Sequence, residues 1–452
     1  MKRLAIFVRA VSVASWLALG CAPVKADPIP DGWQASGLKP IGYTDLGGRR
    51  GFGNKMAIKR VGDRWYLYKG GNGIEVVDVT DPAAPIFLKV VQGPAGTSAS
   101  QVTLNGNLLI LGLSRPINAE EASGHADGWT PLQKAASKDK PFEESIQLFD
   151  ISDPESPKPL SKWSAGAQGS HRNGYPGGKY AFLSTTVPGY RGFILVILDV
   201  SDPMHPKEAG RWAYPGAKAG EKPGAVTPSY HGPAFVSPDG KMLTVGYTPS
   251  VVNLDISDVA HPKMIGEMKL IPPFINTLTQ SIHTAIPLWE RKLVYFSGEP
   301  MRRNCAEPMT PVGFIDNSDP KHPFLKSLFP MPVPPPGAKY KSFCDKPGRF
   351  GPHNTVTELY NPDVMAPKDT MYVAWFTAGL RAFDISDPRD VRERGWFLPP
   401  DPPAPVTSQG GTLTSNATQD VLQDTRGNIY VTDSAWGIWV LRDERETSSS
   451  NK

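Results

Sequence analysis

Four histidines are the residues of this sequence whose type and spacing best suit chemistry. Each has a Gly or Ser two positions earlier in the chain, and they are His171, His231, His283 and His353. Neutral imidazole is the commonest metal ligand in proteins, and four of them suit iron, copper, zinc or manganese better than calcium or magnesium. No carboxylate partner is evident among them. The sequence therefore predicts a four-histidine site for a transition metal, if the fold brings the four side chains together.

The elements that would position these histidines come from an internal repeat. An apolar run ending in Asp, then Ser or Thr, a second Asp and usually Pro, occurs six times. The copies are IEVVDVTDPAAP, IQLFDISDPESP, LVILDVSDPMHP, VVNLDISDVAHP, VGFIDNSDPKHP and LRAFDISDPRDV, which end at Pro85, Pro157, Pro206, Pro262, Pro323 and Val391. Because Asp and Ser side chains bond turn amides and Pro presets φ, each copy indicates a strand, a tight turn and a second strand. The first Asp of each copy is expected to cap its strand rather than bind metal: Asp78, Asp150, Asp199, Asp255, Asp316 and Asp384.

Two more strand-like runs precede each copy, as in residues 233–237 and 241–246 around a Pro-Asp-Gly turn. Four antiparallel strands in units of about 40 to 60 residues are typical of a β-propeller. We therefore expect an all-β, seven-bladed propeller. Its blades begin near Asn54, Ala99, His171, His231, His283, His353 and Thr418. The last blade lacks a fourth strand, and residues 38–46 are predicted to supply it and so close the ring.

The segment LVILDVSDP at Leu195 to Pro203 resembles the LVIVD-repeat β-propeller proteins. The resemblance extends over nearly the whole chain after its leader and implies the propeller fold. Members of that family are often secreted or on cell surfaces, and most have no assigned function. Because propellers host unrelated functions, activity must be sought in the residues that are not repeated.

In a propeller, the four histidines would open the innermost strands of four consecutive blades and face one end of the channel. Asn54, Ala99 and Thr418 hold the aligned positions in the other blades, so a blade does not require the histidine. The arrangement is similar in architecture to the carotenoid cleavage oxygenases, in which four histidines of a seven-bladed propeller hold Fe(II), although no sequence motif of theirs is matched. The alternative is that each histidine bonds backbone at the start of its strand and has no further role.

The other histidines have different contexts. Three histidines occupy the same position in the repeat turn and are expected to be structural: His205, His261 and His322. His125 lies in an insertion and has no counterpart in the other blades.

Three insertions should lie on the same face as the four-histidine site, where functional loops commonly gather: Arg115–Glu144, Glu299–Pro311 and Phe329–Phe350. Cys305 and Cys344 fall in two of these, so a disulfide between them would fasten a cover over blades 5 and 6. Alternatively, these loops only cap the channel. Residues near the inner-strand starts could orient a ligand: Asn54, Gln101, Tyr230, Asn354 and Asp420.

Charge and targeting signals narrow the class of protein. The net charge of +4 arises from four basic residues among the first 26, so there is no basic surface for nucleic acid or an anionic membrane.

Residues 1–26 resemble a secretory signal cleaved after Ala26, with a lipoprotein-type site at Cys21 as the alternative. Export to an oxidising compartment would favour the disulfide. No other run reaches the ~18 apolar residues of a transmembrane segment. We expect a propeller over residues 27–446 and a disordered tail over 447–452.

The leading functional hypothesis is a periplasmic or secreted, metal-dependent enzyme that acts on a small organic molecule in the channel mouth. Oxidative chemistry, by an oxygenase or oxidase, is the first expectation, and a lyase or hydrolase is the second. The alternative is a non-catalytic binding propeller that holds a protein or glycan at the cell surface. The sequence has no G-x-S-x-G, H-E-x-x-H, Walker or C-x-x-C motif that would point elsewhere.

Overall fold

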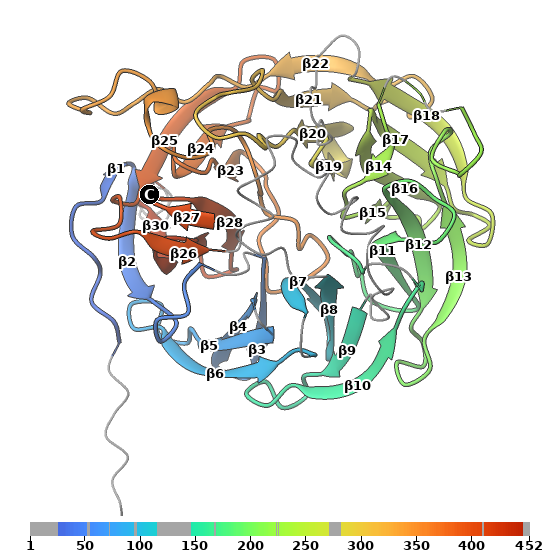
Figure 1. Cartoon of the computed structure of the whole chain (residues 1–452), viewed down its shortest axis with the longest axis horizontal. Helices are drawn as coiled ribbons and strands as arrows, with labels where there is room; N and C mark the ends of the chain where they lie inside the picture. The colour runs from blue at the N-terminus through green and yellow to red at the C-terminus, as the bar shows by residue number, and fades with distance from the viewer. Residues whose placement is uncertain are drawn as a thin grey trace, which may run out of the picture.

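The computed structural model describes residues 26–51, 55–71, 73–94, 97–114, 146–166, 169–222, 224, 226–270, 282–408 and 411–445. Their strands form seven antiparallel blades around a central axis (Figure 1). This confirms the expected all-β, seven-bladed propeller. The predicted leader, the insertion Arg115–Glu144 and the predicted tail lie outside the described residues.

The first four blades follow one another along the chain. Blade 1 contains β3 (Met56–Val61), β4 (Arg64–Gly70), β5 (Gly73–Asp78) and β6 (Ile86–Gln92). Blade 2 contains β7 (Ser98–Asn105), β8 (Leu108–Ser114), β9 (Ile146–Asp150) and β10 (Lys158–Trp163). Blade 3 contains β11 (Tyr180–Thr186), β12 (Phe193–Asp199) and β13 (Lys207–Trp212). Blade 4 contains β14 (Ser229–Tyr230), β15 (Phe235–Val236), β16 (Met242–Thr248), β17 (Ser250–Asp255) and β18 (Lys263–Lys269).

The last three blades include strands from the start of the chain. Blade 5 contains β19 (Thr284–Leu288), β20 (Leu293–Ser297), β21 (Val312–Asp316) and β22 (Phe324–Leu328). Blade 6 contains β23 (Thr370–Ala374), β24 (Leu380–Asp384), β25 (Arg392–Leu398) and β1 (Gln34–Ser36). Blade 7 contains β28 (Thr418–Gln423), β29 (Asn428–Asp433), β30 (Gly437–Asp443) and β2 (Leu38–Thr44). A hairpin of β26 (Val406–Ser408) and β27 (Gly411–Leu413) and two 3-10 turns, η1 (Trp289–Arg291) and η2 (Phe343–Asp345), lie in the connections.

The innermost strand is irregular in blades 3, 4 and 6, where a full strand was expected. In blades 3 and 6 it is reduced to isolated bridges, such as Ser170 with Thr185 and Thr355 with Val373. In blade 4, Pro233 separates β14 from β15, because proline has no N–H to donate to the ladder. The interruptions occur beside three of the four aligned histidines, so these side chains stand where the backbone leaves the sheet.

The repeat turns have the predicted capping. The Asp78 carboxylate accepts a hydrogen bond from the Thr80 amide at 2.9 Å. The equivalent bond forms in the other five copies, to Asp150, Asp199, Asp255, Asp316 and Asp384. The turn histidines are structural as well, since His205, His261 and His322 each place Nδ1 within 2.9 Å of the second Asp of the repeat.

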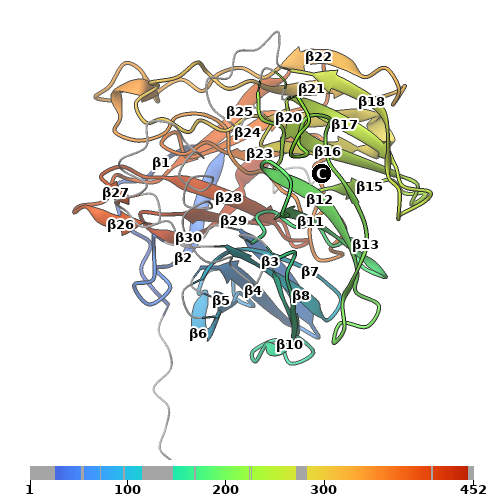
Figure 2. The same cartoon turned by 45° about the vertical axis from the view of Figure 1, so that its right-hand side comes forward.

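The N-terminal segment closes the ring, as predicted. Strand β2 pairs antiparallel with β30, from Leu38 opposite Asp443 to Thr44 opposite Ile438. It forms the outer edge of blade 7, and both views place it beside β30 (Figures 1 and 2). Strand β1 was not expected. It pairs with β25, so the same N-terminal segment also extends blade 6.

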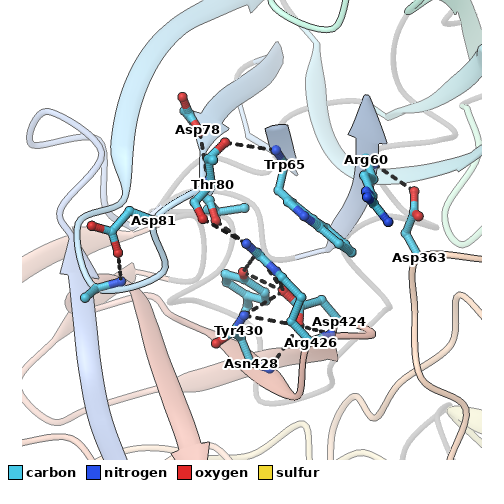
Figure 3. Close-up of polar contacts among 12 residues, drawn as sticks. Arg60, Trp65, Asp78, Thr80, Asp81, Asp363, Asp424, Arg426, Asn428 and Tyr430 are labelled. Carbon is cyan, nitrogen blue, oxygen red and sulfur yellow. Dashed lines mark hydrogen bonds and ion pairs between the residues drawn. The ribbon is translucent and has the colours of Figure 1, made fainter. Parts of the chain in front are cut away.

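A polar network joins the last blade to the first (Figure 3). Arg426, in the turn between β28 and β29, donates to the backbone oxygens of Val79 and Thr80 in blade 1, at 2.9 and 2.8 Å. Its guanidinium lies 4.2 Å from the ring centroid of Trp65, also in blade 1. The buried carboxylate of Asp424 accepts from the same guanidinium at 2.8 Å. Blades 7 and 1 are therefore held together by charged side chains as well as by apolar packing.

One end of the channel is crossed by residues 356–364 of blade 6, visible as an orange segment in the centre of Figure 1. Tyr360 donates its hydroxyl to the Val236 oxygen of blade 4 at 2.8 Å, and its own carbonyl accepts from Asn105 of blade 2 at 2.9 Å. Asn361 donates to the Ile58 oxygen of blade 1 at 2.7 Å. Because this segment follows the inner strand of blade 6, it closes the end opposite the aligned histidines. We call it the plug segment.

Candidate metal centre

The structure brings the four aligned histidines into one row. Their ring centroids are 4.6 Å apart for His171 and His231, 4.1 Å for His231 and His283, and 4.7 Å for His283 and His353. Three of the rings are buried, and His171 is partly exposed. Side chains from four consecutive blades therefore share one small volume at the channel wall.

A carboxylate that the sequence did not reveal joins this row. Glu299, the first residue of the insertion after β20, lies with Oε2 3.4 Å from His283 Nε2 and Oε1 3.6 Å from His353 Nε2. One ligand atom each from His231, His283 and Glu299 lie within 4.8 Å of one another. Its position in the sequence was the one feature that could have indicated this. Glu299 follows the second strand of its blade, and connections from the second to the third strand lie on the face where the inner strands begin.

Backbone carbonyls orient two of the imidazoles. Nδ1 of His231 lies 3.0 Å from the His283 oxygen, and Nδ1 of His353 lies 2.6 Å from the Gln419 oxygen. A carbonyl only accepts, so Nδ1 carries the proton and Nε2 keeps its lone pair. Metal-binding histidines are commonly held in this way, by a second hydrogen bond that fixes the tautomer. For His353, that lone pair faces the side of the row where Glu299 lies.

Arg172 is a second functional candidate that sequence reasoning missed. It directly follows the first aligned histidine and is 2% exposed. Its Nη1 donates to the His283 oxygen at 2.7 Å and to the Thr284 hydroxyl at 2.9 Å, and lies 3.4 Å from His231 Nδ1. Arginine is usually exposed, so a sequence alone does not mark one as buried in a channel wall.

Burial sets the charge state of the cluster. Burial, and then the nearby Arg172 cation, lower the pKa of His171 to about 3. Burial is also the main reason why the pKa values of His231, His283 and His353 lie well below the usual range. Burial raises the pKa of Glu299, and the Arg349 guanidinium, 2.6 Å from Oε1, opposes that shift. The imidazoles are therefore neutral at pH 7, as ligation requires.

The other residues expected at the mouth occupy different surroundings. Asn54 lies outside the described residues. Asp420 is buried, accepts from the Met56 amide at 2.9 Å and faces Lys55 Nζ at 3.7 Å. Gln101 lines a small pocket together with Arg172. Two more are also buried: Tyr230, whose ring stacks on Tyr247 in the core between blades 3 and 4, and Asn354.

The predicted disulfide between Cys305 and Cys344 is confirmed. It joins the two insertions over blades 5 and 6, which are also tied by the Asn304 amide donating to the Gly348 oxygen at 2.6 Å. Next to Gly348, Arg349 reaches the candidate metal centre through its ion pair with Glu299. The disulfide therefore fastens the loop that holds this carboxylate in place.

Replacement of both cysteines by serine should lower the free energy of unfolding. The bond closes a loop with a sequence separation of 39, for which the loss of loop-closure entropy is worth up to roughly 4 kcal/mol. Denaturant titration of the variant and the wild type measures the difference. As a control, thiol counting on denatured, unreduced protein beginning at Asp27 should find no free thiol, and two titratable thiols would contradict the pairing.

Comparison with known protein families identifies the same repeat that the sequence pattern indicated. The LVIVD repeat matches residues 54–92 and 190–213, in blades 1 and 3. No curated protein matches the sequence. Among solved structures, the Pseudomonas aeruginosa periplasmic gluconolactonase PpgL is similar over 81% of this chain and 91% of its own, with 13% identity and a TM-score of 0.49. The computationally designed protein Ika8 is similar over 85% of this chain and 82% of its own, with 8% identity and a TM-score of 0.41.

Within the ranges that the structure describes, no helix has the length and hydrophobicity to cross a lipid bilayer. Two of the repeated strand–Asp–turn segments lie in the stretches that match the LVIVD repeat, and the strands of the chain build seven blades around one axis. The chain is a seven-bladed β-propeller that contains LVIVD repeats in blades 1 and 3.

Proposed function

We propose that this propeller is an exported, metal-dependent enzyme that acts on a small organic molecule at the channel mouth. The observation that carries the proposal is the grouping of His231, His283 and Glu299, whose ligand atoms lie within 4.8 Å of one another. Two imidazoles and one carboxylate are a donor set used for non-haem iron and for catalytic zinc, and copper and manganese also accept these donors. His353 and His171 stand beside this group and complete the ligand set.

The surrounding residues suit a resident cation. Backbone carbonyls hold Nδ1 of His231 and His353, so in each ring the lone pair that a metal ion would use is on Nε2. A histidine with a purely structural role would need only such a backbone bond. The buried Glu299 beside the Nε2 atoms therefore favours a metal site, because burying a carboxylate is costly unless it is paired. Arg349 offsets part of that cost and fixes the position of the carboxylate.

A metal ion bound here would supply Lewis acidity or redox chemistry. The protein would supply a buried and rigid ligand set, with His171 at the partly exposed end of the row. Phe376 stacks on His353 with a centroid separation of 4.5 Å and shields that side from water. Oxidation of the substrate is the first choice, and hydrolysis or a lyase reaction is the second. The disulfide supports export, since such bonds persist mainly in oxidising compartments.

Metal-dependent turnover tests this proposal. Chelator-stripped protein is reloaded separately with Fe(II), Cu(II), Zn(II) and Mn(II), and then assayed for oxygen uptake with small organic molecules and for hydrolysis of small esters and amides. We expect turnover with one of these ions and none with stripped protein. Metal binding without any turnover would favour the non-catalytic binding propeller, which would hold a protein or glycan with the same face.

A further inference from the structure

The metal site leaves most of the hydrogen-bonding capacity of Arg172 unexplained. A guanidinium has five N–H donors. The described hydrogen bonds of this side chain all involve Nη1, which contacts backbone and hydroxyl oxygens of blades 4 and 5 and Nδ1 of His231 and His283. Nε and Nη2 are buried, and among the described residues neither has a hydrogen-bond partner. Leaving a buried, charged donor without an acceptor is unfavourable, so this edge of the guanidinium favours an incoming acceptor.

Arg172 lines a pocket whose walls suit an anion. The pocket is also lined by Lys55, Gln101 and Asn173, together with apolar groups that include Ile110 and Pro233. These residues come from blades 1, 2, 3 and 4, so the pocket lies inside the ring. Its volume of about 10 Å³ admits one small polar group, and the cationic and amide donors of the wall would fix such a group.

The second cation of the pocket also retains donors. Lys55 Nζ lies 3.7 Å from a carboxylate oxygen of Glu358 and 3.7 Å from one of Asp420. Both separations exceed the usual hydrogen-bond distance of about 2.7 to 3.2 Å. These two acids stabilise the charge of Lys55 without occupying its hydrogen bonds. An additional acceptor can therefore bind Lys55 from the pocket side.

Arg172 is charged at neutral pH and stands next to the histidine row. An arginine side chain stays protonated in proteins, so burial does not remove this charge. Its Nη1 lies 3.3 Å from Nδ1 of His283, whose other nitrogen faces Glu299. The guanidinium that would hold the ligand is therefore in contact with a proposed metal ligand.

We propose that the Nε and Nη2 edge of Arg172 binds a carboxylate of the substrate, with Lys55 and Gln101 completing the pocket. This inference rests on the proposed function and names the substrate class as small organic acids. The paired N–H groups of this edge match the two oxygens of a carboxylate, a geometry that lysine cannot reproduce. Nη1 meanwhile anchors the guanidinium to blades 4 and 5.

Acetate binding tests the inference, with acetamide as the neutral isostere and inorganic phosphate as the other anion. Isothermal titration of untagged, metal-containing protein should show binding of acetate and much weaker binding of acetamide and phosphate. Arg172→Gln should weaken acetate binding about 10- to 100-fold, the loss expected for one charge-assisted bidentate contact. The acetate affinity of Arg172→Lys should lie between that of the wild type and that of Arg172→Gln. Arg211→Gln, on the outer strand of the same blade, removes a partly exposed arginine and should leave binding unchanged.

Metal content separates this inference from the proposed function. If acetate bound the metal itself, Arg172→Gln would retain both the ion and the acetate affinity, and the inference would be overturned. If the wild-type protein bound acetate and acetamide equally well, this result alone would overturn the inference. Acetate binding that depends on Arg172 in a protein that takes up no metal would refute the enzyme proposal, and with it the role of acetate as a substrate mimic.

Discussion

A protein that begins at Gly47 instead of Asp27 should aggregate or unfold far below the wild-type melting temperature. The deletion removes β2 and exposes the edge of β30, whose Trp439 and Val440 are fully buried. It also removes Tyr43, which lies 4.9 Å from the Trp439 ring and donates its hydroxyl to the Trp436 oxygen at 2.6 Å. Loss of one large core aromatic costs about 3 to 5 kcal/mol, against a total stability of about 5 to 15 kcal/mol for typical domains. An exposed sheet edge adds a route to aggregation.

A matched truncation isolates the contribution of the strands. A protein that begins at Trp33 keeps β1 and β2 and loses the Asp27 carboxylate, which accepts from the Asp45 amide, and the partly buried Ile29 side chain. It should melt close to the wild type. Calorimetry or circular dichroism of the three proteins gives the comparison. If the protein beginning at Gly47 melts at the wild-type temperature, β2 does not hold the ring closed.

Loss of Glu299 or of His283 should nearly abolish metal binding. Each contributes a ligand atom to the group within 4.8 Å, and Glu299 is the only carboxylate of that group. Disturbing an outer partner of a metal ligand already costs about 10- to 100-fold in affinity, so loss of a ligand should exceed this. Glu299→Gln keeps the shape of the side chain and removes its charge, and His283→Ala removes an imidazole. Metal occupancy by elemental analysis after desalting is the measurement.

The remaining histidines provide graded controls for that experiment. His231→Ala should match His283→Ala, while His353→Ala and His171→Ala should also lower occupancy. The three turn histidines bond exposed aspartates far from the channel, so His205→Ala, His261→Ala and His322→Ala should retain the ion. Unchanged occupancy in all four variants of the aligned histidines would refute the site.

The repeat made the blades predictable because their signals are local. Asp78 and its five equivalents cap turns through amides two residues away, so neighbouring residues suffice to identify the role. The closing strand was also predictable, because Lys39-Pro40-Ile41-Gly42 resembles the start of an outer strand and the last blade lacked one. The row of histidines followed from their shared position in consecutive blades.

The residues that the sequence did not reveal depend on contacts between distant segments. Glu299 begins an insertion, and its sequence does not indicate which side chain turns toward the channel. The plug segment 356–364 contacts four other blades through scattered hydrogen bonds and leaves no periodic pattern. Tyr230 was expected at the mouth, but its ring packs between blades 3 and 4, because side chains alternate sides along a strand.

The metal content of the wild-type protein tests the central claim most directly. The protein is purified without an affinity His tag, supplied with iron, copper, zinc and manganese, desalted and analysed for all four elements. The grouping of His231, His283 and Glu299 beside two further neutral imidazoles predicts one transition-metal ion per chain. Protein that retains none of the four metals would contradict the account and leave the propeller as a binding scaffold.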